Sequence, residues 1–261
     1  KLRGVWEPAL LACTGASQLV EKRNSSGRQL EGLDTRDLPT EPQIAVIPEN
    51  DVRIHCDLSG GQKTGYFFDQ RPHREWFARL APGKSVLDVF SYVGAWGLGA
   101  AKAGAQSVLC VDSSASALEQ LQSSANENSL QVETRCQDAL EALRELRDAG
   151  RSFDLIVVDP PALIKRKKDY DQGREHYARL NHVALQCLAP GGVLFASSCS
   201  HHMPAEVLAA MVQREAAKLG RELQLFHSGG AGPDHPVHPA MPETGYLKTF
   251  AFRCLARPSS R

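Results

Sequence analysis

Two side chains of catalytic residue types stand directly after apolar runs in this sequence. Asp159 follows Phe153–Val158, and Cys199 follows the run Val193–Ser197 and Ser198. An apolar run that ends in polar, turn-forming residues is typical of a buried parallel strand, and ligands of open α/β sheets bind at the carboxyl ends of such strands. The spacing therefore predicts a carboxylate and a thiol at the edge of one cleft.

The carboxylate belongs to Asp159-Pro160-Pro161, in which two rigid residues without backbone donors follow the acid. Such a loop can accept hydrogen bonds from the amine of a planar base. The same three residues also suit a simple stop between a strand and a loop.

The thiol suits a different chemistry, in which a thiolate adds to carbon 6 of a pyrimidine and makes carbon 5 nucleophilic enough to take a methyl group. A base must then remove the proton from carbon 5. Ser198, Ser200, His201 and His202 flank Cys199, and polar neighbours or an imidazolium favour a thiolate. The alternative is a small buried cysteine. A metal site at the two histidines lacks a third ligand at a recognisable spacing.

Three further acids, Asp88, Asp112 and Asp138, stand at the ends of three successive predicted strands. The loop after Asp88 lacks the Gly-x-Gly-x-x-Gly order of pyrophosphate binding, so it suits another nucleotide-like ligand. S-adenosylmethionine offers a cationic amino-acid portion for the first acid, a ribose for Asp112 and an adenine for Asp138. Any one of these acids alone would more simply cap a helix, but three together favour a cofactor site.

Helix-like and strand-like patterns alternate from Lys84 onward, which predicts βαβ units on a parallel sheet. Residues 1–60 are rich in glycine, proline and turn residues, with extended candidates at Ala16–Val20, Ile44–Ile47 and Val52–Cys56. We therefore expect a small β-containing domain over 1–60 and a larger α/β domain over 61–261.

The composition is that of a globular protein with no global charge, because 30 basic residues balance 30 acidic ones. An odd number of cysteines, seven, without paired short spacings favours reduced thiols and a cytoplasmic location. No stretch approaches the length of a membrane span, so we expect no membrane partner.

A local run of positive charge follows the Asp-Pro-Pro loop and favours contact with nucleic-acid phosphates, although most charge runs are solvated faces. This run is Lys165, Arg166, Lys167 and Lys168. Several aromatic residues can stack on a flipped base or equally belong to the core; they are Tyr66, Phe67, Tyr92, Trp96 and Tyr170.

With these residues assembled, the chain resembles the ribosomal RNA large subunit methyltransferase I family of cytosine-C5 enzymes. The resemblance is loose at Arg28–Leu33 and close from Gly61 to Arg71 and beyond. It is carried by Gly61-Gln62-Lys63-Thr64-Gly65-Tyr66-Phe67-Phe68-Asp69-Gln70-Arg71, Phe90-Ser91-Tyr92-Val93-Gly94, Val158-Asp159-Pro160-Pro161 and Ser198-Cys199-Ser200.

The resemblance implies a seven-stranded Rossmann-like sheet with its last strand antiparallel, S-adenosylmethionine as cofactor and ribosomal RNA as partner. It also implies an RNA-binding domain of the PUA type ahead of residue 1, which suggests that the chain is a fragment. Cys199 would be the nucleophile and Asp159 would orient the base, while the stretch from Gln62 to Arg71 closes over the cofactor. The implied cofactor residues are Asp69, Asp88, Phe90, Ser91, Tyr92, Gly94, Asp112, Ser113 and Asp138.

Two departures from the family leave alternatives open. Ala162 stands where some relatives have lysine after Asp-Pro-Pro, and His201 follows Ser200 where some have smaller residues. The base that removes the carbon-5 proton is thus undecided among His201, His235 and Glu243. Methylation of a base nitrogen with a structural Cys199, a non-catalytic RNA-binding module and a homodimer also remain alternatives.

Overall fold

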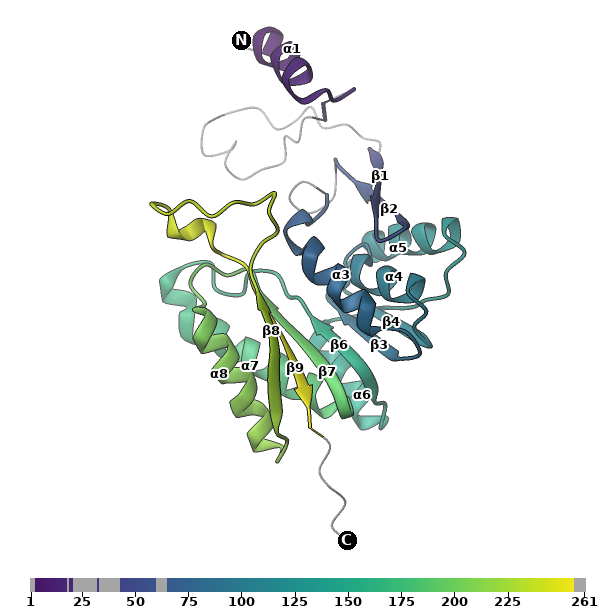
Figure 1. Cartoon of the computed structure of the whole chain (residues 1–261), viewed down its shortest axis with the longest axis vertical. Coiled ribbons are helices and arrows are strands. Elements are labelled where there is room, and N and C mark those ends of the chain that lie inside the picture. The colour runs from purple at the N-terminus through teal and green to yellow at the C-terminus, as the bar shows by residue number, and fades with distance from the viewer. Residues whose placement is uncertain (1–2, 18, 21–31, 33–42, 60–64, 256–261) are drawn as a thin grey trace. The chain divides into compact units, whose positions relative to one another are not determined.

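A computed structural model describes residues 3–17, 19–20, 32, 43–59 and 65–255 (Figure 1). The chain forms two compact units, one of residues 1–46 and 56–66 and one of residues 47–55 and 67–261. Residues 28–31, 33 and 61–64, which carried part of the resemblance, lie outside the described residues. The expected domain boundary between residues 60 and 61 stays a prediction.

The N-terminal part contains a helix that the sequence did not indicate. Helix α1 spans Arg3–Thr14 although Pro8 lies inside it, and a proline within a pattern normally argues against a helix. The strands β1 (Ile44–Glu49) and β2 (Val52–Asp57) form a two-stranded sheet, as expected. The extended segment expected at 16–20 was wrong, since its described residues 16, 17, 19 and 20 lie in no strand.

The larger unit is built on a seven-stranded sheet of order β5-β4-β3-β6-β7-β9-β8. β9 alone runs in the direction opposite to the other six strands of this sheet, so the predicted α/β architecture with one reversed strand is confirmed. The strands are β3 (Ser85–Val89), β4 (Ser107–Asp112), β5 (Glu133–Cys136), β6 (Phe153–Val158), β7 (Leu188–Ser198), β8 (Leu223–Gly229) and β9 (Lys248–Cys254).

Helices cover both faces of this sheet (Figure 1). On β7, Leu194 and Ala196 join a core cluster with residues of α6, α7 and α8, whereas Phe195 packs edge-on against Phe77 of α3 and Trp96 of α4. Successive side chains of β7 therefore contact helices on opposite faces of the sheet, as expected for a strand that is buried on both faces. The helices are α3 (Arg71–Leu80), α4 (Ala95–Lys102), α5 (Ala115–Glu127), α6 (Ala139–Asp148), α7 (Tyr170–Gln186) and α8 (Ala205–Lys218).

The strand order reverses between β3 and β6, and their register pairs Asp88 with Val157. In doubly wound sheets a ligand binds outside the carboxyl ends of the strands at such a point. The fold therefore brings the ends of β4, β3, β6 and β7 to one edge, where Asp112, Asp88, Asp159 and Cys199 stand.

Candidate functional site

The loop between β3 and α4 has an unusual backbone. Phe90 and Tyr92 adopt positive φ angles of 67° and 50°, which residues with side chains rarely do, and Gly94 has a φ of 81°. A Cβ atom on Gly94 would lie 2.4 Å from Cγ of Leu121, so α5 leaves room only for glycine. Backbone strain of this kind is concentrated at functional sites, where the surrounding structure holds it in place.

Asp88 is fully buried beneath this loop. Its Oδ2 accepts a hydrogen bond of 2.9 Å from the backbone N–H of Gly97 in the first turn of α4. Burial raises the pKa of Asp88 to about 8, because the hydrogen bond from Gly97 only partly offsets the loss of water around the carboxylate. A cation placed beside Asp88 would restore its charged form.

Three buried oxygen atoms at this edge have no hydrogen-bond partner among the described residues: Oδ1 of Asp88, Oδ1 of Asp69 and Oγ of Ser91. Buried polar atoms are nearly always paired, so unpaired ones gathered at a site indicate a missing ligand. Two carboxylate oxygens and a hydroxyl suit a ligand that carries a cationic amino group. This chemistry fits the amino-acid portion of S-adenosylmethionine.

The other two strand-end acids, Asp112 and Asp138, already accept hydrogen bonds from backbone N–H groups. Asp112 accepts hydrogen bonds from the N–H groups of Tyr92 at 2.8 Å and Ser114 at 2.9 Å. Asp138 is the N-cap of α6, since its Oδ1 accepts from the N–H of Leu140 at 2.9 Å. Each carboxylate keeps further lone pairs for a ligand, and the cofactor roles of Asp112, exposed Ser113 and exposed Asp138 stay predictions.

Asp159 is held between two side-chain donors. Gln70 donates through Nε2 to its Oδ1 at 2.9 Å, and Trp96 donates through Nε1 to its Oδ2 at 3.1 Å. Burial nevertheless raises the pKa of Asp159 to about 6, because desolvation outweighs these two hydrogen bonds. The carboxylate is therefore oriented and mostly ionised at neutral pH, and it can accept a hydrogen bond from a substrate amine.

The segment that supplies Gln70 is fixed by a buried ion pair. Arg74 of α3 binds Glu49 through two hydrogen bonds, of 2.5 and 2.7 Å, and also donates to the carbonyl oxygen of Phe67 at 2.8 Å. Gln70 in turn accepts a hydrogen bond from Thr249 of β9 at 3.0 Å. These contacts orient the side chain of Gln70, which directly precedes α3, toward the sheet edge.

Cys199 is partly exposed at the end of β7. Its Sγ lies 3.9 Å from the carbonyl oxygen of Pro160, so the predicted nucleophile and the Asp-Pro-Pro loop are brought together. The flanking serines turn away from the cleft and are buried: Ser198 and Ser200 both share hydrogen bonds with the hydroxyl of Tyr177 on α7, at 2.9 and 3.0 Å.

Two site residues that the sequence analysis missed are Tyr246, just before β9, and Lys248, the first residue of β9. The hydroxyl of Tyr246 donates to Oδ2 of Asp69 at 2.7 Å. The Nζ of Lys248 donates to the carbonyl oxygen of Ser200 at 2.7 Å. The one available signal was a polar start to an otherwise apolar strand, which by itself does not point to a site.

The aromatic candidates divide between the site and the core. Phe67 and Tyr92 meet edge-on at 5.6 Å between ring centroids, beside the strained loop. Trp96 is 4% exposed and Tyr66 is 4% exposed, so both are buried. Tyr170 packs against the core cluster.

The basic run from Lys165 to Lys168 is exposed throughout. Within it, Arg166 forms an ion pair of 2.9 Å with Asp169. The remaining three cations face solvent, which suits phosphate contact and a solvated loop equally.

The candidate bases for the carbon-5 proton lie at or near the surface. Among them, His201 and Glu243 are exposed, and His235 is partly exposed beside Asp234 at 3.0 Å.

The described residues contain no group of three or more metal-ligating side chains. None of their helices has the length and hydrophobicity needed to cross a bilayer.

One protein family, described as S-adenosylmethionine-dependent methyltransferase, has a sequence model that matches residues 5–253. The Ribosomal RNA large subunit methyltransferase I of Shewanella amazonensis is 39% identical over 238 residues, which cover 90% of this chain and 60% of the relative. The protein of that name from Vibrio cholerae is 36% identical over 258 residues, which cover 95% of this chain and 64% of the relative. The chain thus spans 60 to 64% of the length of these relatives.

Solved structures share the fold. A candidate SAM-dependent methyltransferase from Streptococcus mutans superposes with a TM-score of 0.72 at 23% identity, over 82% of this chain and 56% of that chain. A candidate methyltransferase complexed with SAH gives a TM-score of 0.72 at 24% identity, over 82% of this chain and 57% of that chain.

Proposed function

The chain belongs to the S-adenosylmethionine-dependent methyltransferases, and on that premise we propose that it methylates carbon 5 of a cytosine in large-subunit ribosomal RNA. Its cofactor is S-adenosylmethionine. The RNA substrate is supported by the two relatives named Ribosomal RNA large subunit methyltransferase I, which are 36 to 39% identical to this chain. A cytoplasmic location belongs to the same proposal and agrees with seven cysteines, none of which forms a disulfide.

The cofactor residues are proposed from the sheet edge. Asp88 and Asp69 would hold the cationic amino group, since each has a buried oxygen that no described residue pairs. Asp112 would accept from the ribose and Asp138 from the adenine amine. The loop residues that complete the pocket are Phe90, Ser91, Tyr92, Gly94 and Ser113.

The bound cofactor supplies an electrophilic methyl group on a sulfonium sulfur. The Cys199 thiolate adds to carbon 6 of the cytosine, forming a carbon–sulfur bond and moving the electron pair of the double bond onto carbon 5. Once carbon 5 carries the methyl group, a base takes its proton, the electron pair of that bond restores the double bond, and the sulfur leaves with its own pair. His201, His235 and Glu243 remain candidates for this base.

Asp159 orients the cytosine in this proposal. Its carboxylate is held by Gln70 and Trp96 and can accept from the exocyclic amine of the base. The single observation that carries the proposal is the distance of 3.9 Å between Sγ of Cys199 and the carbonyl oxygen of Pro160, because it joins thiol and base-binding loop in one site.

Methylation of a base nitrogen is the second candidate. It is favoured by the same oriented carboxylate, which suffices to bind an amine without any thiol chemistry. A non-catalytic RNA-binding module would leave the cofactor edge without a ligand, and heat-stabilisation by S-adenosylmethionine would exclude that alternative.

The deciding experiment is mass spectrometry of nucleosides from unmodified ribosomal RNA incubated with S-adenosylmethionine and either wild type, Cys199→Ala or Cys136→Ala. Cys136 is an exposed cysteine at the end of β5 and serves as the matched control. We expect 5-methylcytidine with wild type and Cys136→Ala and none with Cys199→Ala. A methylated nitrogen that persists in Cys199→Ala would replace the proposal with the nitrogen reaction.

A further inference from the structure

Lys248 lies directly beside the turn that carries Cys199. It opens β9, where it pairs across the antiparallel ladder with Ser198, the residue before the cysteine. Its Nζ donates to the carbonyl oxygens of Ser200 and Tyr246, both at 2.7 Å. The amine is thus tied to the residue on the other side of Cys199 as well.

A lysine in this setting is unusual because it is 8% exposed and the hydrogen bonds of its Nζ go to two carbonyl oxygens rather than to a carboxylate. Burial lowers the pKa of Lys248 to about 8, while the charges of Cys199 and Glu206 act in the opposite direction. A buried lysine without a paired carboxylate is costly, and such lysines are found where the amine acts on a functional group nearby.

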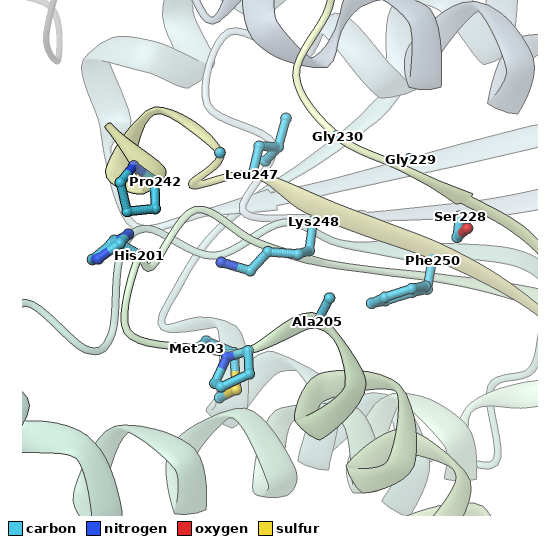
Figure 2. Close-up of a pocket in the computed structure, with 12 residues that line it drawn as sticks. His201, Met203, Ala205, Ser228, Gly229, Gly230, Pro242, Leu247, Lys248 and Phe250 are labelled. Carbon is cyan, nitrogen blue, oxygen red and sulfur yellow. The ribbon is translucent and has the colours of Figure 1, made fainter. Parts of the chain in front are cut away.

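The amine also borders a cavity of about 480 Å³, which Figure 2 shows in close-up. The side chain of Lys248 extends toward His201, and Met203 and Phe250 form apolar walls nearby. Water can reach the amine through this cavity, so its proton can exchange with solvent.

The hydrogen bonds of Lys248 leave one N–H of its charged form for an anion. An ammonium group has three N–H donors, and two carbonyl oxygens occupy two of them. The third donor and the positive charge can act on the neighbouring thiolate. The charged and titratable groups that act on Cys199 and Lys248 are Tyr177 from α7, Glu206 from α8 and Tyr246 ahead of β9.

We propose that Lys248 is the positioning residue that holds Cys199 as a thiolate. The S–H bond of Cys199 breaks, the sulfur keeps the electron pair, and the proton passes to water that enters through the cavity, while the ammonium group of Lys248 stabilises the thiolate. The catalytic meaning of this step rests on the proposed function, in which Cys199 is the nucleophile. The step itself needs neither RNA nor cofactor.

The test is the pH dependence of thiol alkylation by iodoacetamide, followed by mass spectrometry of the peptide that contains Cys199. Exposed Cys136 is the internal reference in the same molecule. In wild type we expect Cys199 to become reactive at lower pH than Cys136. In Lys248→Met we expect alkylation of Cys199 at neutral pH to slow about tenfold, the effect of one pKa unit, with Cys136 unchanged.

Lys248→Arg keeps a positive charge and should retain most of the neutral-pH reactivity of Cys199, which a merely structural role would not predict. An unchanged Cys199 profile in Lys248→Met would overturn the inference. If that variant does not fold, a wild-type Cys199 that titrates no lower than Cys136 overturns it equally. If nucleoside analysis found a product other than 5-methylcytidine, the proposed function would fail but these alkylation results would still hold. The two proposals can therefore fail separately.

Discussion

Asp88 combines complete burial with an oxygen that no described residue pairs, and this makes its effect on stability opposite to that of a paired carboxylate. Its folded pKa of about 8 lies above the unfolded value, so the folded protein holds a proton that the unfolded chain releases. Its contribution to the free energy of unfolding therefore falls as pH rises from about 4 to 8, by up to about 1.4 kcal/mol per pH unit. Asp88→Asn should remove this dependence, which urea unfolding at several pH values measures.

The same substitution should weaken the binding of S-adenosylmethionine by about tenfold or more, because the cationic amino group loses its buried counter-charge. Calorimetric titration gives this Kd. Asp154→Asn is the control, since Asp154 binds Ser85 at the opposite end of the strands. Equal loss of affinity in both variants would contradict the assignment.

At the residue scale, the sequence could indicate the strand-end acids but not their partners. Asp88, Asp159 and Cys199 follow apolar runs, and that position alone predicts the sheet edge. Gln70 contacts Asp159 from 89 positions away, and Lys248 reaches Ser200 from 48 positions away. Such pairs arise from the strand order, which no local pattern contains.

Helix α4 provides a test of how tightly the loop between β3 and α4, the proposed cofactor loop, is packed. A Cβ atom on Gly97 would lie 2.4 Å from Sγ of Cys110 and 3.3 Å from Oδ2 of Asp88. We expect Gly97→Ala to destabilise the protein by about 2 kcal/mol, as overpacking does, and to lower cofactor affinity. Urea unfolding and calorimetry measure both effects.

Gly99 lies on the same helix and is the matched control. Its added Cβ would approach nothing closer than 3.5 Å, so Gly99→Ala should be neutral or stabilising by up to about 1 kcal/mol. Similar destabilisation in both variants would mean that helix α4 tolerates neither alanine and that the contact with Asp88 is not the cause.

At the element scale, long apolar strands were predictable and exceptions had local causes. The predicted strand Phe153–Val158 matches β6 in full, because an apolar run between polar turns has one interpretation. β7 starts at Leu188 rather than 193, since its first residues include a proline and two glycines, which are typical of a turn. Helix α1 was missed because Gly4 and Pro8 disrupt its pattern.

At the scale of the whole molecule, the net charge is zero, so any attraction for RNA must be local. We expect Lys167→Gln combined with Lys168→Gln to weaken binding of ribosomal RNA fragments. The plot of log affinity against log salt should become shallower by roughly 0.7 to 0.9 for each phosphate that the protein no longer neutralises. Fluorescence anisotropy over a salt series measures this slope.

The control pair is Lys102→Gln with Arg144→Gln, which removes the same charge from exposed positions on α4 and α6. If both pairs change the slope equally, the basic run has no special role. The homodimer stays a prediction that none of these variants addresses.

Strand β9 lies between β7 and β8 although it follows both in the chain. During synthesis on the ribosome, β8 therefore emerges before the strand that joins it to the sheet, and β7 keeps one edge open until then. Tyr246, Lys248 and Thr249, which contact Asp69, Ser200 and Gln70, arrive with that last strand. A nascent chain that ends before β9 already carries Cys199 but lacks its surroundings, so translation itself must reach the final strand before the thiol has its neighbouring amine.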